Sequence, residues 1–214
     1  MLRKAIREKV AAAMIRTETP RGRGQGVLVP GELILTAAHC LEWTHTGAMV
    51  LGDYFPQTIR AGGKKLNTSP LAIEAVSDVA VLGPFDAPEC SADYDKFIAF
   101  CESTEPIELW LDDPEPRKPF PVYVFTHTRT VVKATAKLMN PHAYTLYVEA
   151  SEQIKGGTSG GPVVAEDGRL LGVVHSFSKK ARGKCDGGVS RPHLTVPPWL
   201  LRRMNPKKSN STDA

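Results

Sequence analysis

The chain has 214 residues, of which 42% are hydrophobic and 23% charged, and its formal net charge is +4. This balance is typical of a globular protein with a sizeable core, and it excludes disordered, collagen-like and disulfide-framework chains. No apolar run approaches the ~20 residues that a membrane-spanning helix requires, so we expect no membrane span.

The positive charge lies at the two ends of the chain. Residues 1–24 hold seven basic and two acidic side chains, and residues 202–214 hold four and one. The stretch between them therefore carries a net charge of −4. Basic arms could contact nucleic acid, but no interleaved aromatic and arginine residues and no recognition-helix pattern accompany them. We interpret the ends as solvated segments and expect no nucleic-acid partner.

Taken in chain order, the elements begin with a helix predicted around residues 3–14, and a second helix is predicted after Pro197, around Trp199. Between them, short runs rich in Val, Leu, Thr and aromatics are separated by Gly, Pro, Asn and Asp, which predicts strands. The predicted strands are residues 26–29, 33–36, 49–51, 72–76, 79–82, 121–126, 130–137, 144–150, 161–164 and 170–176. So many short strands favour barrels or a sandwich over a βαβ protein.

Residues 112–119 are charged and rich in proline, which is typical of a linker between two halves of similar size. The chain is thus divided into a basic N-terminal extension (1–24), a first half (25–111), the linker, a second half (120–204) and a disordered tail (205–214). Only the two halves are expected to form cores.

Three segments carry residue types used in nucleophilic catalysis. His39 ends a predicted strand, and the two alanines before it leave room for its ring. Asp78 enters an apolar run, where a carboxylate needs hydrogen-bond donors, and an imidazole is the simplest one. Ser159 lies between glycines, which leave its hydroxyl uncovered and let successive N–H groups point to one place. Each also has a structural interpretation: a packed histidine, a strand-initiating aspartate and an ordinary Gly/Ser loop.

Together the three segments resemble the chymotrypsin-like, or trypsin-like, serine peptidase family. Residues 36–40 (Thr-Ala-Ala-His-Cys) and 78–82 (Asp-Val-Ala-Val-Leu) match its histidine and aspartate motifs, and residues 157–162 (Gly-Thr-Ser-Gly-Gly-Pro) match its serine motif except at Thr158. The order His, Asp, Ser is that of the family, and the spacings of 39 and 81 residues suit its compact bacterial and viral members.

The resemblance implies an all-β fold of two six-stranded Greek-key barrels with a short C-terminal helix and a catalytic triad between the barrels. Residues 25–111 would carry His39 and Asp78, and residues 120–204 would carry Ser159. It further implies that Ser159 is the nucleophile of a serine endopeptidase, His39 its general base and Asp78 the residue that orients the imidazole. The backbone N–H groups of Gly157 and Ser159 would form the oxyanion hole.

Departures from the family pattern concern activation and compartment. Secreted members carry an acidic residue at the position of Thr158, which pairs with a new N-terminus after proteolysis, so activation by N-terminal cleavage is not expected here. Cys40 has no cysteine before it to form the usual disulfide. The first ten residues do not form a secretion signal, because charges interrupt any apolar run. The resemblance is therefore to cytoplasmic, zymogen-free peptidases.

The primary specificity pocket is assigned only by the resemblance. Gln153 would lie at its floor, where trypsin-type enzymes have an aspartate, so a preference for Arg or Lys is not expected. His175, Ser176, Phe177 and Gly188 would form its walls. A histidine there resembles glutamate-selective relatives and favours an acidic or polar residue before the cleaved bond; the alternative is that His175 packs near the triad.

A second class of function stays open: a binding module of peptidase fold, or an enzyme gated by a regulatory protein partner. The leading hypothesis has a protein or peptide as substrate. The six His and four Cys show no ligand-like spacing, so neither a metal nor another cofactor is predicted.

Overall fold

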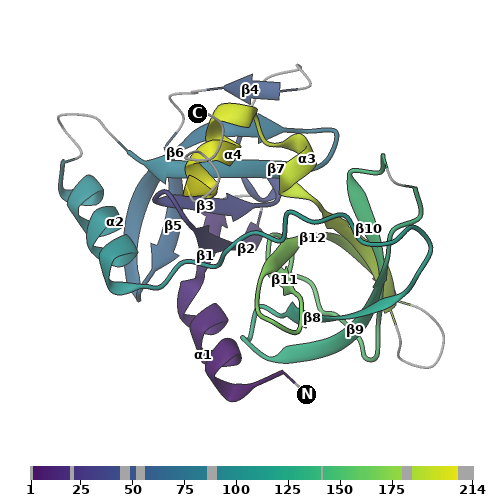
Figure 1. Cartoon of the computed structure of the whole chain (residues 1–214). Helices are drawn as coiled ribbons and strands as arrows, with labels where there is room; N and C mark the ends of the chain where they lie inside the picture. Colours follow the sequence, from purple (N-terminus) through teal and green to yellow (C-terminus); the bar gives the residue numbers. More distant parts are fainter. Residues whose placement is uncertain are drawn as a thin grey trace.

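Strands make up most of the computed structural model, which describes residues 2–19, 22–43, 49–51, 56–85, 91–140, 142–179 and 185–206. They form two barrels that lie next to each other, with helices at their outer edges (Figure 1). All strand pairs within the two barrels are antiparallel.

The first barrel has the strand order β6-β5-β1-β2-β3-β7 and is closed by pairing of β6 with β7, while β4 adds to the outside of β6. Its strands are β1 (Met14–Thr19), β2 (Gly22–Val29), β3 (Leu33–Thr36), β4 (Met49–Leu51), β5 (Gln57–Ala61), β6 (Lys64–Glu74) and β7 (Val79–Pro84).

The second barrel is a closed ring with the strand order β10-β13-β12-β11-β8-β9. Its strands are β8 (Phe120–Phe125), β9 (Val131–Lys137), β10 (Thr145–Ala150), β11 (Pro162–Val164), β12 (Leu170–Lys179) and β13 (Cys185–Ser190). In β9 and β10, buried and exposed side chains alternate, as expected for strands with one face toward a barrel interior. The predicted all-β fold of two six-stranded barrels is confirmed.

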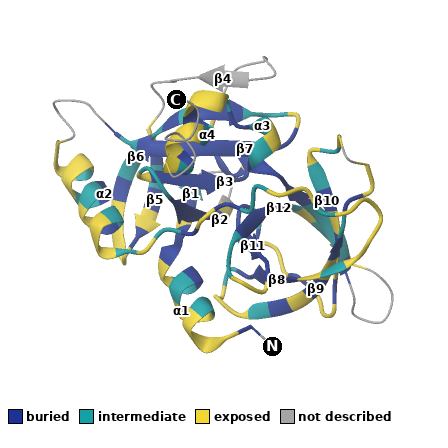
Figure 2. Ribbon diagram, in the orientation of Figure 1, coloured by how far each residue is buried: buried dark blue, intermediate teal, exposed yellow. Residues whose placement is uncertain are grey.

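One hydrophobic core runs through the first barrel and continues into the contact between the barrels. It includes Val10 of the N-terminal helix and reaches Tyr123, Phe125 and Leu170 of the second barrel. A separate core fills the second barrel, around residues such as Val148. Figure 2 shows that buried residues are concentrated on the strands of the two barrels, while many residues of the helices and turns are exposed. The barrels are therefore packed against each other rather than merely tethered.

The helices are α1 (Lys4–Ala13), α2 (Ser91–Ser103), α3 (Pro192–Thr195) and α4 (Pro198–Met204), with a 3-10 turn at Ala38–Cys40. The sequence predicted helices only at the two ends, so α2 corrects that prediction. Its buried apolar face is short, because only Phe97 and Phe100, one turn apart, are buried. Two positions are too few to produce a clear 3.6-residue pattern.

The first barrel also begins earlier than predicted. Strands β1 and β2 start at Met14 and Gly22, inside the segment that the sequence assigned to a basic extension. Strand β1 (Met-Ile-Arg-Thr-Glu-Thr) and β5 (Gln-Thr-Ile-Arg-Ala) are rich in polar residues, so neither was predicted. Strand β6 begins at Lys64 rather than at 72, and a register shift near Pro70 lets it accommodate a proline.

Residues 112–119 contain no helix or strand, and the chain just before them joins the second barrel through a parallel bridge from Leu109 to Leu170. Of the predicted tail, Asn205 and Pro206 are described, and residues 207–214 lie outside the described residues. Among the described helices, none has both the length and the apolar composition to cross a membrane.

Candidate active site

His39 and Asp78 meet at one end of the first barrel. The 3-10 turn that follows β3 carries His39, and Asp78 immediately precedes β7. The imidazole Nδ1–H donates a hydrogen bond of 2.6 Å to Asp78 Oδ2, and the backbone N–H of His39 donates one of 2.8 Å to Asp78 Oδ1. Both carboxylate oxygens are thus used to fix the position of one histidine.

The environment of this pair favours a charged imidazole. Asp78 is 7% exposed, whereas 49% of the His39 side chain is exposed. The hydrogen bond from the imidazole to the Asp78 carboxylate raises the pKa of His39 above its usual 6.5, and a contact with the Cys40 thiol acts in the same direction. An imidazole held in this way has one tautomer and a stabilised cationic form, as a general base requires.

The backbone around Asp78 is itself constrained. Its φ of 56° is unusual for a residue with a side chain. The carbonyl of Asp78 accepts a hydrogen bond of 3.3 Å from Ala38 N–H, and the Ser190 hydroxyl of the second barrel donates to the carbonyl of Ser77. Contacts from both barrels therefore hold Asp78 in this conformation.

Ser159 lies in a loop that is attached to both barrels. Its carbonyl accepts a hydrogen bond of 2.7 Å from Gln25 N–H on β2, and Gly160 N–H donates one of 2.8 Å to the carbonyl of Val174 on β12. Gly160 has a φ of 75°, and a Cβ there would lie 2.1 Å from the Gln25 carbonyl oxygen. Only glycine fits at this position, so Gly160, one of the glycines predicted to frame the serine, is needed by the geometry.

The surface of this loop is suited to a reacting group. The Ser159 residue is partly exposed, and Gly157 before it has a φ of 84°. In the described part of the chain, the backbone N–H groups of Gly157 and Ser159 have no hydrogen-bond acceptor, and the Ser159 hydroxyl makes no hydrogen bond to His39. Catalytic hydrogen bonds are often long in free enzymes and shorten when substrate binds.

Gln25 is a site residue that the sequence analysis did not identify. It is 3% exposed, and its side-chain Nε2 donates to the carbonyl of Gly24 at 2.9 Å and to that of Gly157 at 3.3 Å. Both partners are carbonyls, so the side-chain nitrogen must face them. The sequence signal, a glutamine between two glycines at the start of a strand, does not by itself indicate a contact with residue 157.

Thr158 occupies the position of the acidic residue found in secreted family members, and it is 1% exposed. Its hydroxyl accepts a hydrogen bond of 3.4 Å from the backbone N–H of His127 in the second barrel. The loop is therefore held to the second barrel by the neutral side chain of Thr158 and to the first barrel by Gln25.

The residues proposed for the specificity pocket do not all come together. Ser176 pairs with Gly188 across β12 and β13, and a Cβ on Gly188 would lie 3.5 Å from His175 Nδ1. Phe177 packs partly on the second core. Gln153 is exposed in the loop after β10, and no described contact joins it to the other four.

His175 approaches the candidate triad rather than standing apart from it. Its Nε2 lies 3.7 Å from Asp78 Oδ2, on a side chain that is 39% exposed. The carboxylate of Asp78 therefore has one histidine from each barrel beside it. This is the alternative that the sequence analysis gave for His175.

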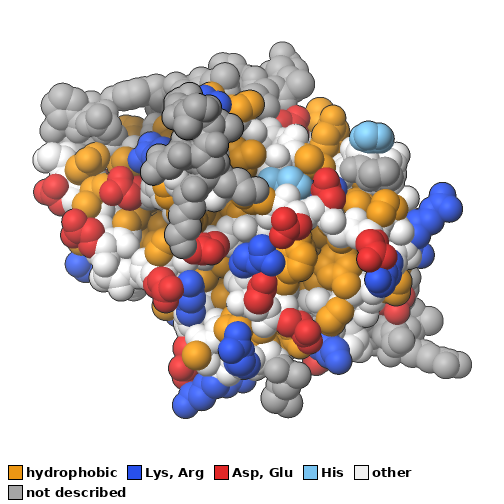
Figure 3. Space-filling model, viewed as in Figure 1, with side chains coloured by type: hydrophobic (Ala, Val, Ile, Leu, Met, Phe, Trp, Pro, Cys, Tyr) orange, Lys and Arg blue, Asp and Glu red, His pale blue; other side chains and the backbone are white. Residues whose placement is uncertain are grey.

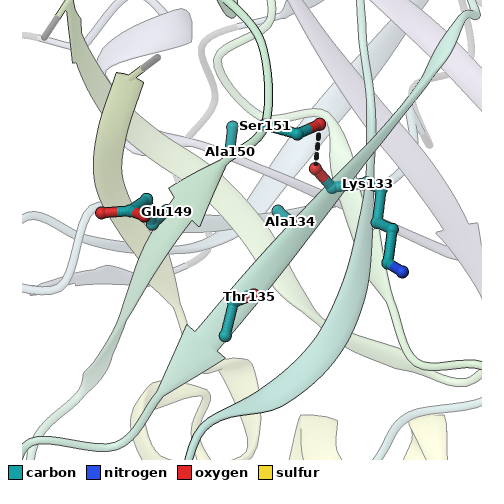
Figure 4. A pocket seen from close by; sticks show the side chains of 6 residues that line it. All are labelled: Lys133, Ala134, Thr135, Glu149, Ala150 and Ser151. Carbon is teal, nitrogen blue, oxygen red and sulfur yellow. Dashed lines mark hydrogen bonds between the residues drawn. The ribbon is translucent and has the colours of Figure 1, made fainter. Parts of the chain in front are cut away.

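A hollow of about 220 Å³ on the outside of the second barrel is separate from these residues (Figure 4). It lies over β9 and β10, where Lys133, Thr135 and Glu149 line it and the Ser151 hydroxyl donates to the carbonyl of Lys133. None of His39, Asp78 and Ser159 lines it. Within the described ranges, no three His, Cys, Asp or Glu side chains are grouped as metal ligands would be.

Comparisons with known structures place the fold in a class. Two closed six-stranded antiparallel barrels, packed together and followed by a short helix, form a chymotrypsin-like fold. The structure is similar to the active form of the Rv3671c protease from M. tuberculosis, with a TM-score of 0.54 and 20% identity, over 89% of this chain and 82% of that one.

Two further structures are similar at comparable levels. For the serine protease of a human pathogenic astrovirus the TM-score is 0.51 and the identity 18%, over 87% of this chain and 94% of that one. For the serine endoprotease from Yersinia pestis the TM-score is 0.58 and the identity 17%, over 88% and 62%. A comparison with curated proteins found no match.

A match to a family model shows the family to which the chain belongs. Residues 24–173 match the trypsin-like peptidase domain, which is more than half of the chain. The chain therefore belongs to the trypsin-like peptidase family.

Proposed function

We propose that the protein is a serine endopeptidase that hydrolyses peptide bonds through an acyl-enzyme intermediate. Ser159 Oγ attacks the carbonyl carbon, His39 Nε2 takes the hydroxyl proton and later donates it to the leaving amine, and Asp78 keeps the imidazole oriented. A water molecule, activated by the same imidazole, then hydrolyses the acyl-enzyme. The N–H groups of Gly157 and Ser159 stabilise the oxyanion, each by about 3–4 kcal/mol in the transition state.

The observation that carries this proposal is the pair of hydrogen bonds from His39 to Asp78, at 2.6 and 2.8 Å. A structural histidine would need neither a half-exposed ring nor a nearly buried carboxylate that uses both oxygens on it. The glycine-framed loop, with two N–H groups that have no acceptor among the described residues, supplies the other half of the reaction.

The mode of activation is part of the proposal. Since Thr158 is neutral and buried, it has no charge to pair with a new N-terminus, and its hydroxyl instead accepts a hydrogen bond from His127 N–H. We therefore infer that the oxyanion loop takes its working shape without N-terminal cleavage. The free thiols of Cys40, Cys101 and Cys185 favour a reducing compartment such as the cytoplasm.

The proposed substrate is a protein or peptide. A preference for Arg or Lys before the cleaved bond is not expected, because none of the candidate wall residues His175, Ser176 and Phe177 is acidic. The contact with Asp78 favours a role for His175 beside the triad carboxylate. Whether His175 also favours an acidic substrate residue before the cleaved bond is tested with a peptide library varied at that substrate position. Cleavage after Leu or Phe with none after Glu would contradict the acidic preference.

The experiment that tests the activity is labelling of the active serine with a fluorophosphonate, with Ser159→Ala as the control. We expect one labelled site in the wild type and none in the variant. Circular dichroism of both proteins shows that they are folded. A folded wild type that resists labelling would contradict the proposal and favour the alternative of a binding or partner-gated module.

A further inference from the structure

A cavity of about 440 Å³ lies beside the candidate oxyanion loop, where the two barrels meet. We call it the arginine pocket. Its lining includes Arg16 of β1, Arg23 of β2, His127 from the turn between β8 and β9, and the loop glycines Gly156 and Gly157. A Cβ on Gly157 would lie 3.8 Å from the Arg23 carbonyl oxygen and 3.8 Å from His127 Cβ. The pocket is therefore adjacent to the loop that carries Ser159.

The charge of the arginine pocket sets it apart. Two guanidinium groups line it, and among the described residues no carboxylate does. Three other hollows in the described structure each include at least one glutamate: Glu149 in the first, Glu105 and Glu108 in the second, and Glu152 in the third. On the face seen in Figure 3, cationic and anionic side chains are likewise interspersed. A pocket lined by positively charged side chains attracts anions.

The arrangement of Arg16 is unfavourable for the folded protein alone. Its register partner on β5 is Arg60, so two guanidinium side chains stand directly opposite each other. Glu18 is the register partner of Arg23 on β2, but its ion pair, at 2.6 Å, is with Arg60. In the described part of the chain Arg16 has no acidic partner. Its charge is thus available to a ligand.

His127 contributes a second unpartnered group. Its Nδ1 is buried and has no hydrogen-bond partner among the described residues. The His127 residue is partly exposed and lines the pocket, where an imidazole N–H can donate to an acidic ligand. Gly156 has open space where a Cβ would be, which leaves room for such a ligand.

The position of the pocket indicates which part of a substrate it would meet. Under the proposed function, the acyl half of the substrate lies along β12 and β13, where Ser176 and Gly188 pair. The arginine pocket is instead lined by Gly157 and by residues of β1 and β2, and no described residue of β12 or β13 lines it. We propose that it binds an acidic side chain on the leaving-group side of the cleaved bond, so that the enzyme selects substrates with Asp or Glu shortly after that bond.

This inference rests on the proposed function, and its test uses two readouts. The first is kcat/KM for peptides that share one acyl half and carry Glu, Ala or Lys at each of the first three positions after the cleaved bond. At one position we expect Glu to exceed Lys by about tenfold at low ionic strength, which corresponds to two weak ion pairs, and less at high salt. In the double variant Arg16→Gln/Arg23→Gln the ratio should fall to within about twofold.

Arg7→Gln is the matched control, because Arg7 is an exposed arginine that lines a different hollow, with Glu152. It should leave the Glu-to-Lys ratio unchanged. Equal cleavage of Glu and Lys peptides by the wild type would overturn the inference and leave the proposed function intact. An equal loss of preference in Arg7→Gln would also overturn it.

The second readout does not depend on activity. Fluorescently labelled Glu and Lys peptides of the same design are titrated into the Ser159→Ala variant and followed by anisotropy. Tighter binding of the Glu peptide, lost when Arg16 and Arg23 are also replaced by Gln, supports the inference even if the wild type cleaves nothing. Equal binding of both peptides overturns it whatever the wild type does.

Discussion

Asp78 concentrates the interactions that build the candidate site. It accepts two hydrogen bonds from His39, lies 3.7 Å from His175 Nε2 and has a φ of 56°. Its neighbours come from both barrels, and its side chain is nearly buried. A carboxylate in such a place determines both the tautomer of His39 and its affinity for a proton.

The first prediction at this scale concerns pH. A general base must be neutral to accept a proton. Because the pKa of His39 is raised above 6.5, the imidazole stays protonated, and the enzyme inactive, until the pH exceeds that raised value. We expect kcat/KM to rise with pH through a midpoint above 6.5. In Asp78→Asn the anion is gone, so the midpoint should move to lower pH while the rate falls by about 10⁴-fold. A pH profile that is unchanged in the variant would contradict this assignment.

The second prediction concerns Gln25. Replacing it with Leu removes the hydrogen bond that restrains the Gly157 carbonyl, so the N–H groups of the oxyanion loop should be less well oriented. We expect kcat to fall by about tenfold with KM within about twofold. Steady-state kinetics separates the two parameters.

Gln57→Leu is the matched control for Gln25→Leu. Gln57 is also buried in the first barrel, but its side chain binds the backbone of Glu42, at 2.7 and 3.0 Å. Both variants should lower the melting temperature, and only Gln25→Leu should lower kcat. A fall in kcat of the same size in both would show that Gln25 acts through stability alone.

Among the elements, α1 has a role that its charged sequence conceals. Val10 and Ala13 are fully buried in the core that joins the barrels, and Lys9 forms an ion pair of 2.7 Å with Glu105. Ile6 lies so close to the turn before β12 that a Cβ on Gly168 would be 2.8 Å from its Cγ2. The helix thus packs on both barrels.

A third prediction follows from this packing. Val10→Ala removes buried methyl groups and leaves a cavity, so it should lower the free energy of unfolding by about 1–3 kcal/mol. Glu8→Ala changes an exposed residue of the same helix and should change it by less than about 0.5 kcal/mol. Urea unfolding curves give both values. Similar values for the two variants would mean that α1 is not part of the core.

For the whole molecule, the site and the main core both span the two barrels. Gln25 binds Ser159, Ser190 donates to Ser77, and the core continues from the first barrel to Phe125 and Leu170. Interfaces between domains are often small enough to let them move independently. Here the shared core means that unfolding one barrel alone would expose apolar surface of the other and so would cost additional free energy.

The fourth prediction is therefore a single cooperative unfolding transition. Calorimetry should show one peak with equal calorimetric and van't Hoff enthalpies. Val148→Ala, deep in the second barrel, should shift the whole peak to lower temperature rather than split it. Two resolved transitions would show that the barrels are independent units.

The limits of sequence reasoning follow from the range of the interactions. Strands with strong alternation or apolar runs, such as β3 and β9, were predicted closely, because side-chain period is a local property. Strands β1 and β5 were missed, since their sequences are polar and their positions are set by pairing within a closed barrel. Helix α2 was missed because only two of its residues provide an apolar face.

By itself, the sequence determined the fold class and the three candidate residues, since His39, Asp78 and Ser159 each lie in a local motif with a fixed order and spacing. Only the tertiary structure brought Gln25 to the Gly157 carbonyl, His175 to Asp78, and Arg16, Arg23 and His127 to one pocket. These contacts join segments from different barrels, and they depend on how each barrel closes and how the two pack. No local pattern encodes that geometry, because each of these residues has an ordinary neighbourhood along the chain.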